Sequence, residues 1–489
     1  MNVSVPFENS FVDLPDRFYS RQAPAPVSQP GLIRVNESLA RLLGIDPAWL
    51  NSEEGIAAAA GNLVPDGAEP IATVYAGHQF GSWNPQLGDG RAILLGEVLG
   101  SDGERYDIQL KGAGQTPYSR MGDGRSPLGP VLREYMVSEA MAALGVPTTR
   151  SLSAVTTGEL VNREETLPGA VLVRVAKSHI RVGTAQYFAS REDTDALRLL
   201  INHVIDRHYP SARDAETPAL ACFEAIMQRQ ADLIVAWQML GFIHGVMNTD
   251  NMLLSGETVD YGPCAFMDTY HPETVFSSID HGGRYAYRNQ PGIAHWNLAC
   301  LAQALVPLFA DNEEQSIEIA KAALDRFPGY FLDANTAGLR RKLGLATAQA
   351  GDEQLAKDFL DLLEKEQKDF TLAFRLLAEM AGEAPAESIH SLFGFQSAFD
   401  PWIERWQARC AEEDYPDRQA QMLTVNPVLI PRNHLVEEAI TAATYEEDFA
   451  PFHTLVDNLS HPFSLAGVDL KYARPPRPDE VVRQTFCGT

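Results

Sequence analysis

One segment near the middle of the chain limits the possible fold more than any other. It runs from His244 to Gly262 and has the sequence HGVMNTDNMLLSGETVDYG. Polar residues are followed by an apolar run after Asn251, a turn over 255–257 and a short apolar stretch that ends at Asp260. This layout presents Asn251 and Asp260 to one metal ion. Mg²⁺ prefers oxygen ligands, usually one or two carboxylates together with phosphate oxygens, so the pair predicts a site for Mg²⁺ or Mn²⁺ beside a phosphate ligand.

The order of these residues is typical of a protein-kinase catalytic loop and metal motif. In kinases an Asp lies two residues after the His, an Asn follows, and a D-F-G aspartate lies on the next strand. Here Asn251 and Asp260 occupy the last two places, but Val246 stands where the catalytic Asp would be. Asp250, directly before the Asn, is the candidate substitute for that carboxylate. The alternative is that Asp250 only caps the loop by accepting backbone hydrogen bonds.

Two residues upstream fit a kinase-like ATP site. The run 106–111 places Lys111 at the end of a predicted strand, and Glu134 follows in a predicted helix. In a kinase this ion pair orients the lysine toward ATP phosphates. Each residue alone is weak evidence, because lysines at strand ends and glutamates on helices are usually solvated. Their order ahead of Asn251 and Asp260 favours the ATP site.

Glycines depart from the kinase pattern, because no G-x-G-x-x-G precedes the lysine. The nearest sequence is Gly88-Asp89-Gly90-Arg91. On its own it predicts only a turn, but its glycines would let a ligand approach the backbone closely.

Basic residues are concentrated in one stretch of an acidic chain. Residues 169–183 include Arg174, Lys177 and Arg181 without an acidic residue, and Arg120 and Arg125 lie upstream. This concentration indicates an anionic ligand. For Arg174 and Arg181 we favour phosphate contact over the alternative of a solvated strand edge, because strand alternation directs Arg174 away from its apolar neighbours.

Composition restricts the possible partners and location. The chain has 489 residues, 45% of them hydrophobic, and a formal net charge of −26 at pH 7. This charge argues against nucleic-acid and anionic-membrane binding. No apolar run approaches the roughly eighteen residues of a membrane-spanning helix, and the N-terminal residues lack the pattern of a signal peptide. Five scattered cysteines do not suggest a secreted disulfide framework, so a cytoplasmic location is expected.

Secondary-structure signals change along the chain. Predicted strands over 92–98, 106–110, 151–157 and 169–176 surround a predicted helix over 131–144. Helical periodicity follows from Asp193 and includes a helix from Thr217 to about Ile243. The order predicts an α+β, protein-kinase-like bilobal fold with a β-rich N-lobe, a helical C-lobe and terminal additions. The predicted division is 1–70 as an N-terminal extension packed on the core, 71–185 as the N-lobe with Lys111 and Glu134, 186–390 as the C-lobe with the catalytic loop and metal motif, and 391–489 as the C-terminal extension and tail.

Four segments together are more selective than any single kinase motif. They are YAGHQFGSWNPQLGDGRA, LKGAGQTPYSRMGDGRS, HGVMNTDNM and DYGP. With them the chain resembles, from about Asn36 to its C-terminus, the selenoprotein O family of pseudokinases that act as protein adenylyltransferases. The resemblance implies that ATP binds inverted relative to kinases and that AMP passes to a Ser, Thr or Tyr hydroxyl of a protein, releasing pyrophosphate. The triphosphate would then lie where a kinase binds adenine, which accounts for the extra basic residues.

The resemblance also implies roles for particular residues. Asp250 would be the proton acceptor, Asn251 and Asp260 would bind Mg²⁺ or Mn²⁺, and Glu134 would pair with Lys111. The nucleotide would be contacted by Gly88, Gly90, Arg91, Lys111, Asp123, Gly124, Arg174, Arg181 and Asp260. At the C-terminus eukaryotic members carry selenocysteine, whereas this chain has Cys487, and a redox link from Cys487 to Cys264 is a further hypothesis.

Three classes of function are compatible with the motifs. They are an adenylyltransferase, a kinase that transfers the γ-phosphate, and a non-catalytic nucleotide-binding pseudokinase scaffold. An adenylyltransferase is favoured over a kinase by Val246 and by the basic residues Arg174 and Arg181. Retention of both metal ligands weighs against a non-catalytic scaffold. We expect a monomer whose partners are ATP and acceptor proteins, with no nucleic acid and no membrane.

Overall fold

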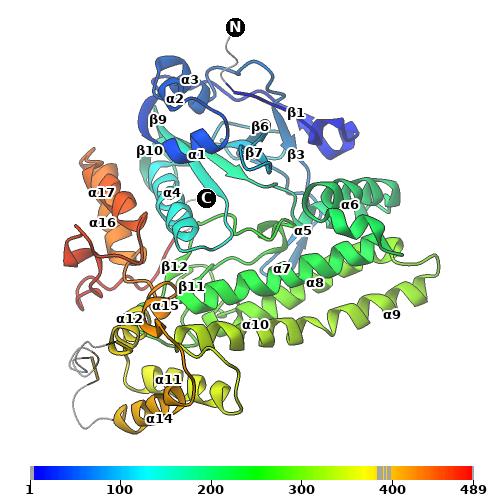
Figure 1. The fold of residues 1–489 in the computed structure, drawn as a ribbon. Coiled ribbons are helices and arrows are strands. Elements are labelled where there is room, and N and C mark those ends of the chain that lie inside the picture. Colours follow the sequence, from blue (N-terminus) through cyan, green and yellow to red (C-terminus); the bar gives the residue numbers. More distant parts are fainter. Residues whose placement is uncertain (1–4, 383–388, 390–391, 394–397, 487–489) are drawn as a thin grey trace.

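The N-terminal part of the chain forms an antiparallel sheet of eight strands (Figure 1). The computed structural model describes residues 5–486 apart from 383–388, 390–391 and 394–397, and every structural statement below concerns these residues. The sheet has the order β1-β3-β6-β7-β10-β9-β2, with β8 paired to β10. Its strands are β1 (Tyr19–Arg21), β2 (Gly31–Val35), β3 (Ile71–Thr73), β6 (Ala92–Leu99), β7 (Arg105–Lys111), β8 (Ser126–Pro127), β9 (Arg150–Asn162) and β10 (Thr166–Ala176). The first seventy residues thus supply a strand at each end of this order, β1 and β2.

The central strands β7 and β10 bring two site residues, Lys111 and Arg174, close together. In the β7–β10 pairing, Lys111 lies opposite Leu172 and Arg174 opposite Gln109. The strands predicted over 92–98 and 106–110 are confirmed as β6 and β7, which form an antiparallel hairpin. The strands predicted over 151–157 and 169–176 are longer than expected, because β9 and β10 continue pairing up to the turn at 163–165.

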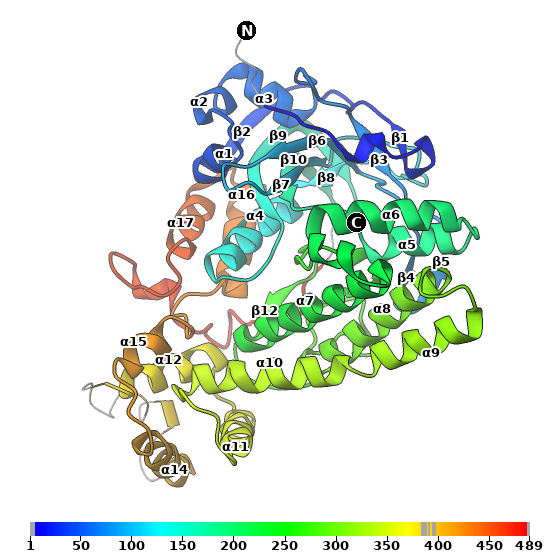
Figure 2. The same ribbon diagram turned by 45° about the vertical axis from the view of Figure 1, so that its right-hand side comes forward.

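Helices dominate the remainder of the chain (Figure 2). The long helices α7, α8 and α10 pack against one another below the sheet. The helices are α1 (Glu37–Leu42), α2 (Pro47–Leu50), α3 (Glu53–Ala60), α4 (Leu128–Ala143), α5 (Val182–Ala189), α6 (Thr194–His208), α7 (Pro218–Leu240), α8 (Gln290–Leu305), α9 (Glu313–Leu324), α10 (Phe327–Lys342), α11 (Asp352–Lys365), α12 (Phe370–Met380), α14 (Asp400–Ala411), α15 (Arg418–Leu423), α16 (Asn433–Tyr445) and α17 (Ala450–Leu459). No helix in the described part of the chain is both long enough and apolar enough to cross a membrane.

Two predicted helix boundaries are wrong for local reasons. Helix α4 begins at Leu128 rather than 131, because Pro130 lies in the first turn, where a backbone N–H has no intrahelical partner to lose. Helix α7 ends at Leu240 rather than 243, because Gly241 adopts a left-handed conformation with φ of 69°. The next two residues form strand β11 (Phe242–Ile243), which pairs with β12 (Ala265–Phe266) and leads directly into the polar loop.

The C-terminal helices support α4, which lies between β8 and β9 in the chain. Helices α16 and α17, orange to red in Figure 1, pack on α4. At this contact Arg133 forms an ion pair with Glu437, and the Tyr135 and Phe452 rings meet edge to face with centroids 5.6 Å apart. The C-terminal part of the chain therefore stabilises the helix that carries Glu134.

Candidate active site

A cleft of about 620 Å³ lies between the sheet and the loop that follows β11. Its lining includes every residue predicted to contact nucleotide or metal, together with Asp250. Among the described residues, seven basic side chains line the cleft, namely Arg91, Lys111, Arg120, Arg125, Arg163, Arg174 and Arg181. Four acidic side chains line it, namely Asp89, Asp123, Asp250 and Asp260. The cleft is therefore basic within a chain of net charge −26.

A buried ion-pair network joins the sheet to the end of the metal motif. The Lys111 ammonium lies 2.5 Å from a Glu134 carboxylate oxygen and 2.9 Å from Asp260 Oδ1. Arg174 Nε donates to the other Glu134 oxygen at 2.6 Å. Burial opposes ionisation of Asp260, but Lys111, Arg174 and Arg91 outweigh it and hold the pKa of Asp260 well below its ordinary value. The predicted Lys111–Glu134 pair is thus in contact, and Asp260 is an anion in the cleft.

The loop after β11 is held in shape by His244. Its buried imidazole accepts from the Val246 backbone at 3.3 Å through Nδ1 and donates to the Val259 carbonyl at 2.9 Å through Nε2. Burial lowers the pKa of His244, which fits this neutral, bridging role. The Asn251 amide nitrogen donates to the Val246 carbonyl at 3.0 Å, and Asp260 adopts a left-handed backbone with φ of 65°. His244 thus joins Val246 to Val259, the residue before Asp260. Asn251 is bonded to the same residue, Val246.

Asp250 is a buried carboxylate at the cleft wall, with 8% of its surface exposed. Gln79 donates to its Oδ2 at 3.2 Å, whereas its Oδ1 has no hydrogen-bond partner among the described residues. Burial raises the pKa of Asp250 to about 6, although the nearby Arg181 charge opposes this shift. No backbone N–H of a neighbouring loop residue in the described part of the chain donates to this side chain, so it has capacity left to accept a proton.

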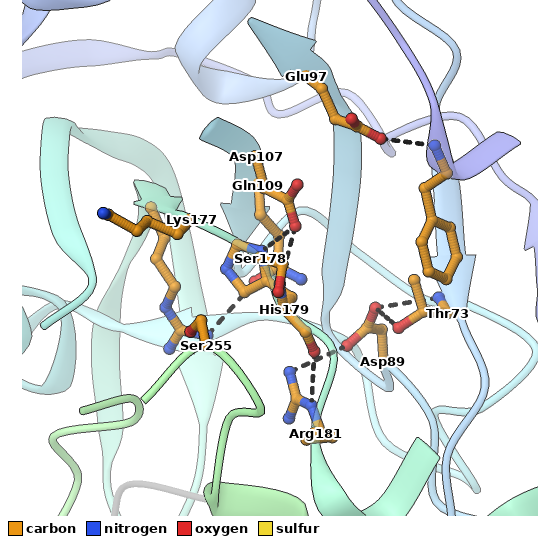
Figure 3. Close-up of polar contacts among 12 residues, drawn as sticks. Thr73, Asp89, Glu97, Asp107, Gln109, Lys177, Ser178, His179, Arg181 and Ser255 are labelled. Carbon is orange, nitrogen blue, oxygen red and sulfur yellow. Dashed lines mark hydrogen bonds and ion pairs between the residues drawn. The ribbon is translucent and has the colours of Figure 1, made fainter. Parts of the chain in front are cut away.

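Arg181 is fixed by a buried polar network (Figure 3). Its Nε donates to the His179 carbonyl at 3.2 Å, and one terminal nitrogen donates to the Asp250 carbonyl at 2.9 Å. Its guanidinium also lies 4.3 Å from the Tyr75 ring centroid and 3.9 Å from Asp89. Neither Arg174 nor Arg181 lies on a solvated strand edge, since each is about 5% exposed. Both are cations held in place at the cleft wall.

Asp107 anchors this network from the sheet side, as Figure 3 shows. Asp107 Oδ2 accepts from the His179 backbone at 2.8 Å and from His179 Nδ1 at 2.9 Å. Its Oδ1 accepts from Arg207 at 2.5 Å. The pKa of Asp107 is lowered despite its burial, because Arg207 and His179 stabilise the carboxylate. The segment that carries Arg181 is therefore tied to β7.

The predicted glycines shape the cleft through close backbone contacts. Gly88 has φ of 73°, and a Cβ on it would meet the Tyr118 ring at 2.4 Å. Gly124 has φ of 68°, and a Cβ on it would meet the Gly114 carbonyl at 2.0 Å. Glycine is therefore required at both turns by conformation and by space.

Asp123 forms an ion pair with Arg163 at 2.9 Å, and this contact lowers the pKa of Asp123.

Comparison with known proteins identifies the family. The family described as protein adenylyltransferase SelO matches residues 2–460. The chain belongs to this family. The chain is 58% identical to a protein nucleotidyltransferase YdiU from Rhodopseudomonas palustris, and 57% identical to proteins of that name from a Bradyrhizobium species and from Bradyrhizobium diazoefficiens, in each case over the whole of both chains.

The extent of the SelO family match differs from the expectation from motifs. The match begins at residue 2, upstream of the start expected near Asn36, and ends at 460. The earlier start has a structural basis, because the residues before Asn36 include β1 and β2 of the main sheet. The family resemblance was expected from motifs around the cleft, and these edge strands carry none.

Asn251 and Asp260 are chemically suited to a divalent metal. The Asp260 carboxylate is ionised. The Asn251 side-chain nitrogen donates to the Val246 carbonyl, so the side-chain oxygen of Asn251 points away from Val246. No group of three or more His, Cys, Asp or Glu side chains in the described residues is arranged to hold a metal. One carboxylate and one amide oxygen suit Mg²⁺ when phosphate oxygens complete its shell.

The cleft contains residues that the motifs did not single out. Gln79 donates to Asp250, and Asn248 in the catalytic loop accepts from the Phe80 backbone. Tyr75 stacks on Arg181, and Arg163 pairs with Asp123. Gln79 lies within the family segment YAGHQFG, which was a possible signal. Arg163 lies in the β9–β10 turn, and nothing in its local sequence indicates that it reaches the cleft.

The structure describes Cys264, one of the two cysteines of the redox hypothesis, whereas Cys487 lies outside the described residues. Cys264 is buried, its thiol contacts the Tyr261 carbonyl at 3.5 Å, and burial raises its pKa to about 12. Close by, Thr485 donates to the Pro263 carbonyl at 2.5 Å and pairs with Ser277. The tail thus passes next to Cys264, and the link to Cys487 stays a prediction.

Proposed function

We propose that this chain transfers AMP from ATP to a Ser, Thr or Tyr hydroxyl of a protein. The observation that carries this proposal is the combination of three fixed cations, Lys111, Arg174 and Arg181, with the partly unpartnered carboxylate of Asp250 in one cleft. Preorganised cations stabilise phosphate charge at little reorganisation cost in a site that excludes water. Val246 offers no carboxylate at the kinase position, which favours a different reaction geometry from γ-phosphate transfer.

The proposed reaction follows from the positions of these groups. Asp250 accepts the proton of the acceptor hydroxyl as the hydroxyl oxygen bonds to the α-phosphorus of ATP. The bond from that phosphorus to the oxygen bridging the β-phosphate breaks, and pyrophosphate leaves with the electron pair. The basic side chains, with the backbone at Gly88, Gly90 and Gly124, hold the nucleotide and neutralise the departing charge. Glu134 keeps Lys111 in place throughout.

Asn251 and Asp260 would hold a divalent cation, Mg²⁺ or Mn²⁺, against the nucleotide. When bound, such an ion neutralises phosphate charge and orients the phosphate chain. Asp260 is suited to this role because basic neighbours keep its carboxylate ionised. Its contact with these side chains can be replaced by a contact with the metal ion.

The wider organisation is proposed on the same basis. A kinase-like bilobal arrangement, with 71–185 as the N-lobe and 186–390 as the C-lobe, is supported by the separation of sheet and helices on either side of the cleft. The segments 1–70 and 391–489 would be additions to these lobes. A cytoplasmic location and a monomeric state stay predictions of the composition.

The proposal is tested by following the two ends of ATP separately. The full-length chain is incubated with Mg²⁺ or Mn²⁺, ATP labelled at the α- or the γ-phosphate, and a pool of Ser, Thr and Tyr peptides, with the chain itself as a further acceptor. Covalent label from the α position alone is expected, and Asp260→Ala should abolish it. Label from the γ position alone would indicate a kinase, and label from neither would indicate a scaffold.

A further inference from the structure

A small hairpin outside the main sheet contacts the catalytic loop directly. It consists of β4 (Gly77–Gln79) and β5 (Ser82–Asn84), which among the described strands pair only with each other. Strand β4 packs on the single helical turn Thr249–Asn251 that contains Asp250. Three consecutive hairpin residues bond to three consecutive loop residues: the His78 backbone donates to Thr249 Oγ1 at 2.7 Å, Gln79 Nε2 to Asp250 Oδ2 at 3.2 Å, and the Phe80 backbone to Asn248 Oδ1 at 2.9 Å.

Both oxygens of Asp250 face this hairpin. Gly77 and Gln79 are two residues apart on one strand, so they lie on the same face. Gln79 donates to Oδ2, and a Cβ on Gly77 would lie 3.0 Å from Oδ1 and 3.2 Å from Asp250 Cβ. Oδ1 is buried and lacks a hydrogen-bond partner among the described residues. The hairpin therefore restricts the orientation of the Asp250 carboxylate. Gln79 donates a hydrogen bond to one oxygen, and Gly77 packs closely against the other.

The hairpin is itself firmly held. His78 Nδ1 lies 2.9 Å from Gln186 Nε2 on α5, and its ring packs against Trp83 and against Trp296 of α8, with centroids 4.9 Å and 5.2 Å away. Its tip is held as well, since the Phe80 ring packs on Tyr285, with centroids 5.1 Å apart. Contacts to two helices make the hairpin a rigid support for the loop.

We propose that Gly77 and Gln79 are positioning residues that set the orientation of the Asp250 carboxylate toward the acceptor hydroxyl. The inference rests on the proposed function, in which Asp250 accepts the hydroxyl proton. The terminal torsion of an Asp side chain has broad, shallow minima, so an external contact is needed to fix it. A displacement of about 1 Å in a reacting group can cost on the order of a hundredfold in rate.

Two substitutions test the two contacts separately. Gln79→Leu keeps the bulk of the side chain but removes the donor, and Gly77→Ala adds a methyl group against Oδ1 at a position without a left-handed backbone. Gln79→Leu should lower the maximal rate of α-label transfer about 10- to 100-fold, the range for a lost hydrogen bond to a charged group. Gly77→Ala should lower it by a similar factor, because the added methyl group displaces the carboxylate. The Kd for ATP should change less than about twofold, because neither residue is assigned to nucleotide binding. A loss of ATP binding in proportion to the rate would contradict the proposal.

The matched control is Ser82→Ala, on the partner strand directly opposite Gln79 and exposed to solvent. It changes the same hairpin without touching Asp250, so its transfer rate should equal that of the unmodified chain. If Gly77→Ala fails to fold, as judged by thermal unfolding, the question is decided by Gln79→Leu alone and in combination with Asp250→Asn.

A double-mutant cycle separates positioning from a general structural effect. In an Asp250→Asn background the carboxylate is gone, so adding Gln79→Leu should lower the residual rate less than about twofold. Independent losses that multiply would overturn the positioning role while leaving the proposed function intact. An Asp250→Asn variant as fast as the unmodified chain would instead overturn the assignment of Asp250 in the proposed function. If the residual rate is too low to measure, the contrast between rate and ATP Kd in Gln79→Leu decides.

Discussion

At the scale of single residues, the Lys111 ammonium is the central element of the buried charge network. It lies between two carboxylates, Glu134 at 2.5 Å and Asp260 at 2.9 Å. Lys111→Met keeps the length of the side chain but leaves Asp260 with less positive charge around it, and it removes a cation from the cleft. We expect AMP transfer to fall on the order of a hundredfold or more, since a fixed charge in such a site is worth several kcal/mol.

The control for Lys111→Met is Lys177→Met. Lys177 follows β10, and its ammonium pairs with Glu104 at the surface. Exposed pairs of this kind contribute about 1 kcal/mol or less, so transfer should be unchanged. Equal losses in both variants would mean that the effect is a general loss of positive charge rather than of the buried pair.

Sequence patterns led to the candidate residues that lie close together in the chain. They missed residues that reach the cleft only through tertiary contacts. Asn251, Asp260 and Asp250 lie in one short segment, and Lys111 and Glu134 follow from one strand and the next helix. The contact of Gln79 with Asp250 joins residues 171 positions apart in the chain. Single-residue patterns contain no information about such a pairing, and for the same reason the burial of Arg181 beneath Tyr75 was not predicted.

Glu257 gives a pH-dependent term in stability. It is buried, accepts from Ser255 at 2.8 Å and from the Lys177 backbone at 2.9 Å, and burial raises its pKa from 4.5 to about 7. The folded state therefore binds the proton more tightly than the unfolded state. Stability is lost as pH rises from about 4.5 to 7, by up to about 3 kcal/mol.

A neutral replacement removes this dependence on pH. Glu257→Gln should unfold at a higher temperature than the unmodified chain at pH 8 and at a similar temperature at pH 5, measured by thermal unfolding. Glu104→Gln, at an exposed carboxylate, serves as the control and should show no such difference. A constant offset between Glu257→Gln and the unmodified chain at both pH values would contradict the assignment.

At the scale of elements, α4 connects the active site to the C-terminal helices. Periodicity predicted α4 itself, but a pattern of apolar residues does not specify which helix covers them. The structure places α16 and α17 there. Ala439 of α16 is fully buried in the shared core. Ala439→Leu should cost about 1–3 kcal/mol by overpacking.

Because α4 carries Glu134, this change should also lower AMP transfer several-fold. Thermal unfolding and α-label transfer measure the two effects, and Glu438→Ala, on the exposed side of α16, is the control. Lower stability with full activity would show that displacement of α16 is not transmitted to Glu134.

At the scale of the whole molecule, the charge distribution determines how a metal can bind. The chain is strongly acidic, yet the cleft lining is basic and its metal candidates are one carboxylate and one amide. Basic neighbours repel a free cation, and no group of three or more potential His, Cys, Asp or Glu ligands is arranged to hold a metal in the described part of the chain. The phosphates of ATP would supply both the missing ligands and the missing negative charge.

Metal binding should therefore depend on nucleotide. Calorimetric titration with Mn²⁺ should show weak binding to the chain alone and binding on the order of tenfold tighter, or more, when a non-hydrolysable ATP analogue is present, after correction for the analogue's own affinity for Mn²⁺. Asp260→Ala should remove this enhancement, because only the Asn251 oxygen would remain. Asp232→Ala, an exposed carboxylate on α7, should retain it. Equally tight binding without nucleotide would mean that the protein supplies a complete metal site, and that the metal and the nucleotide bind independently.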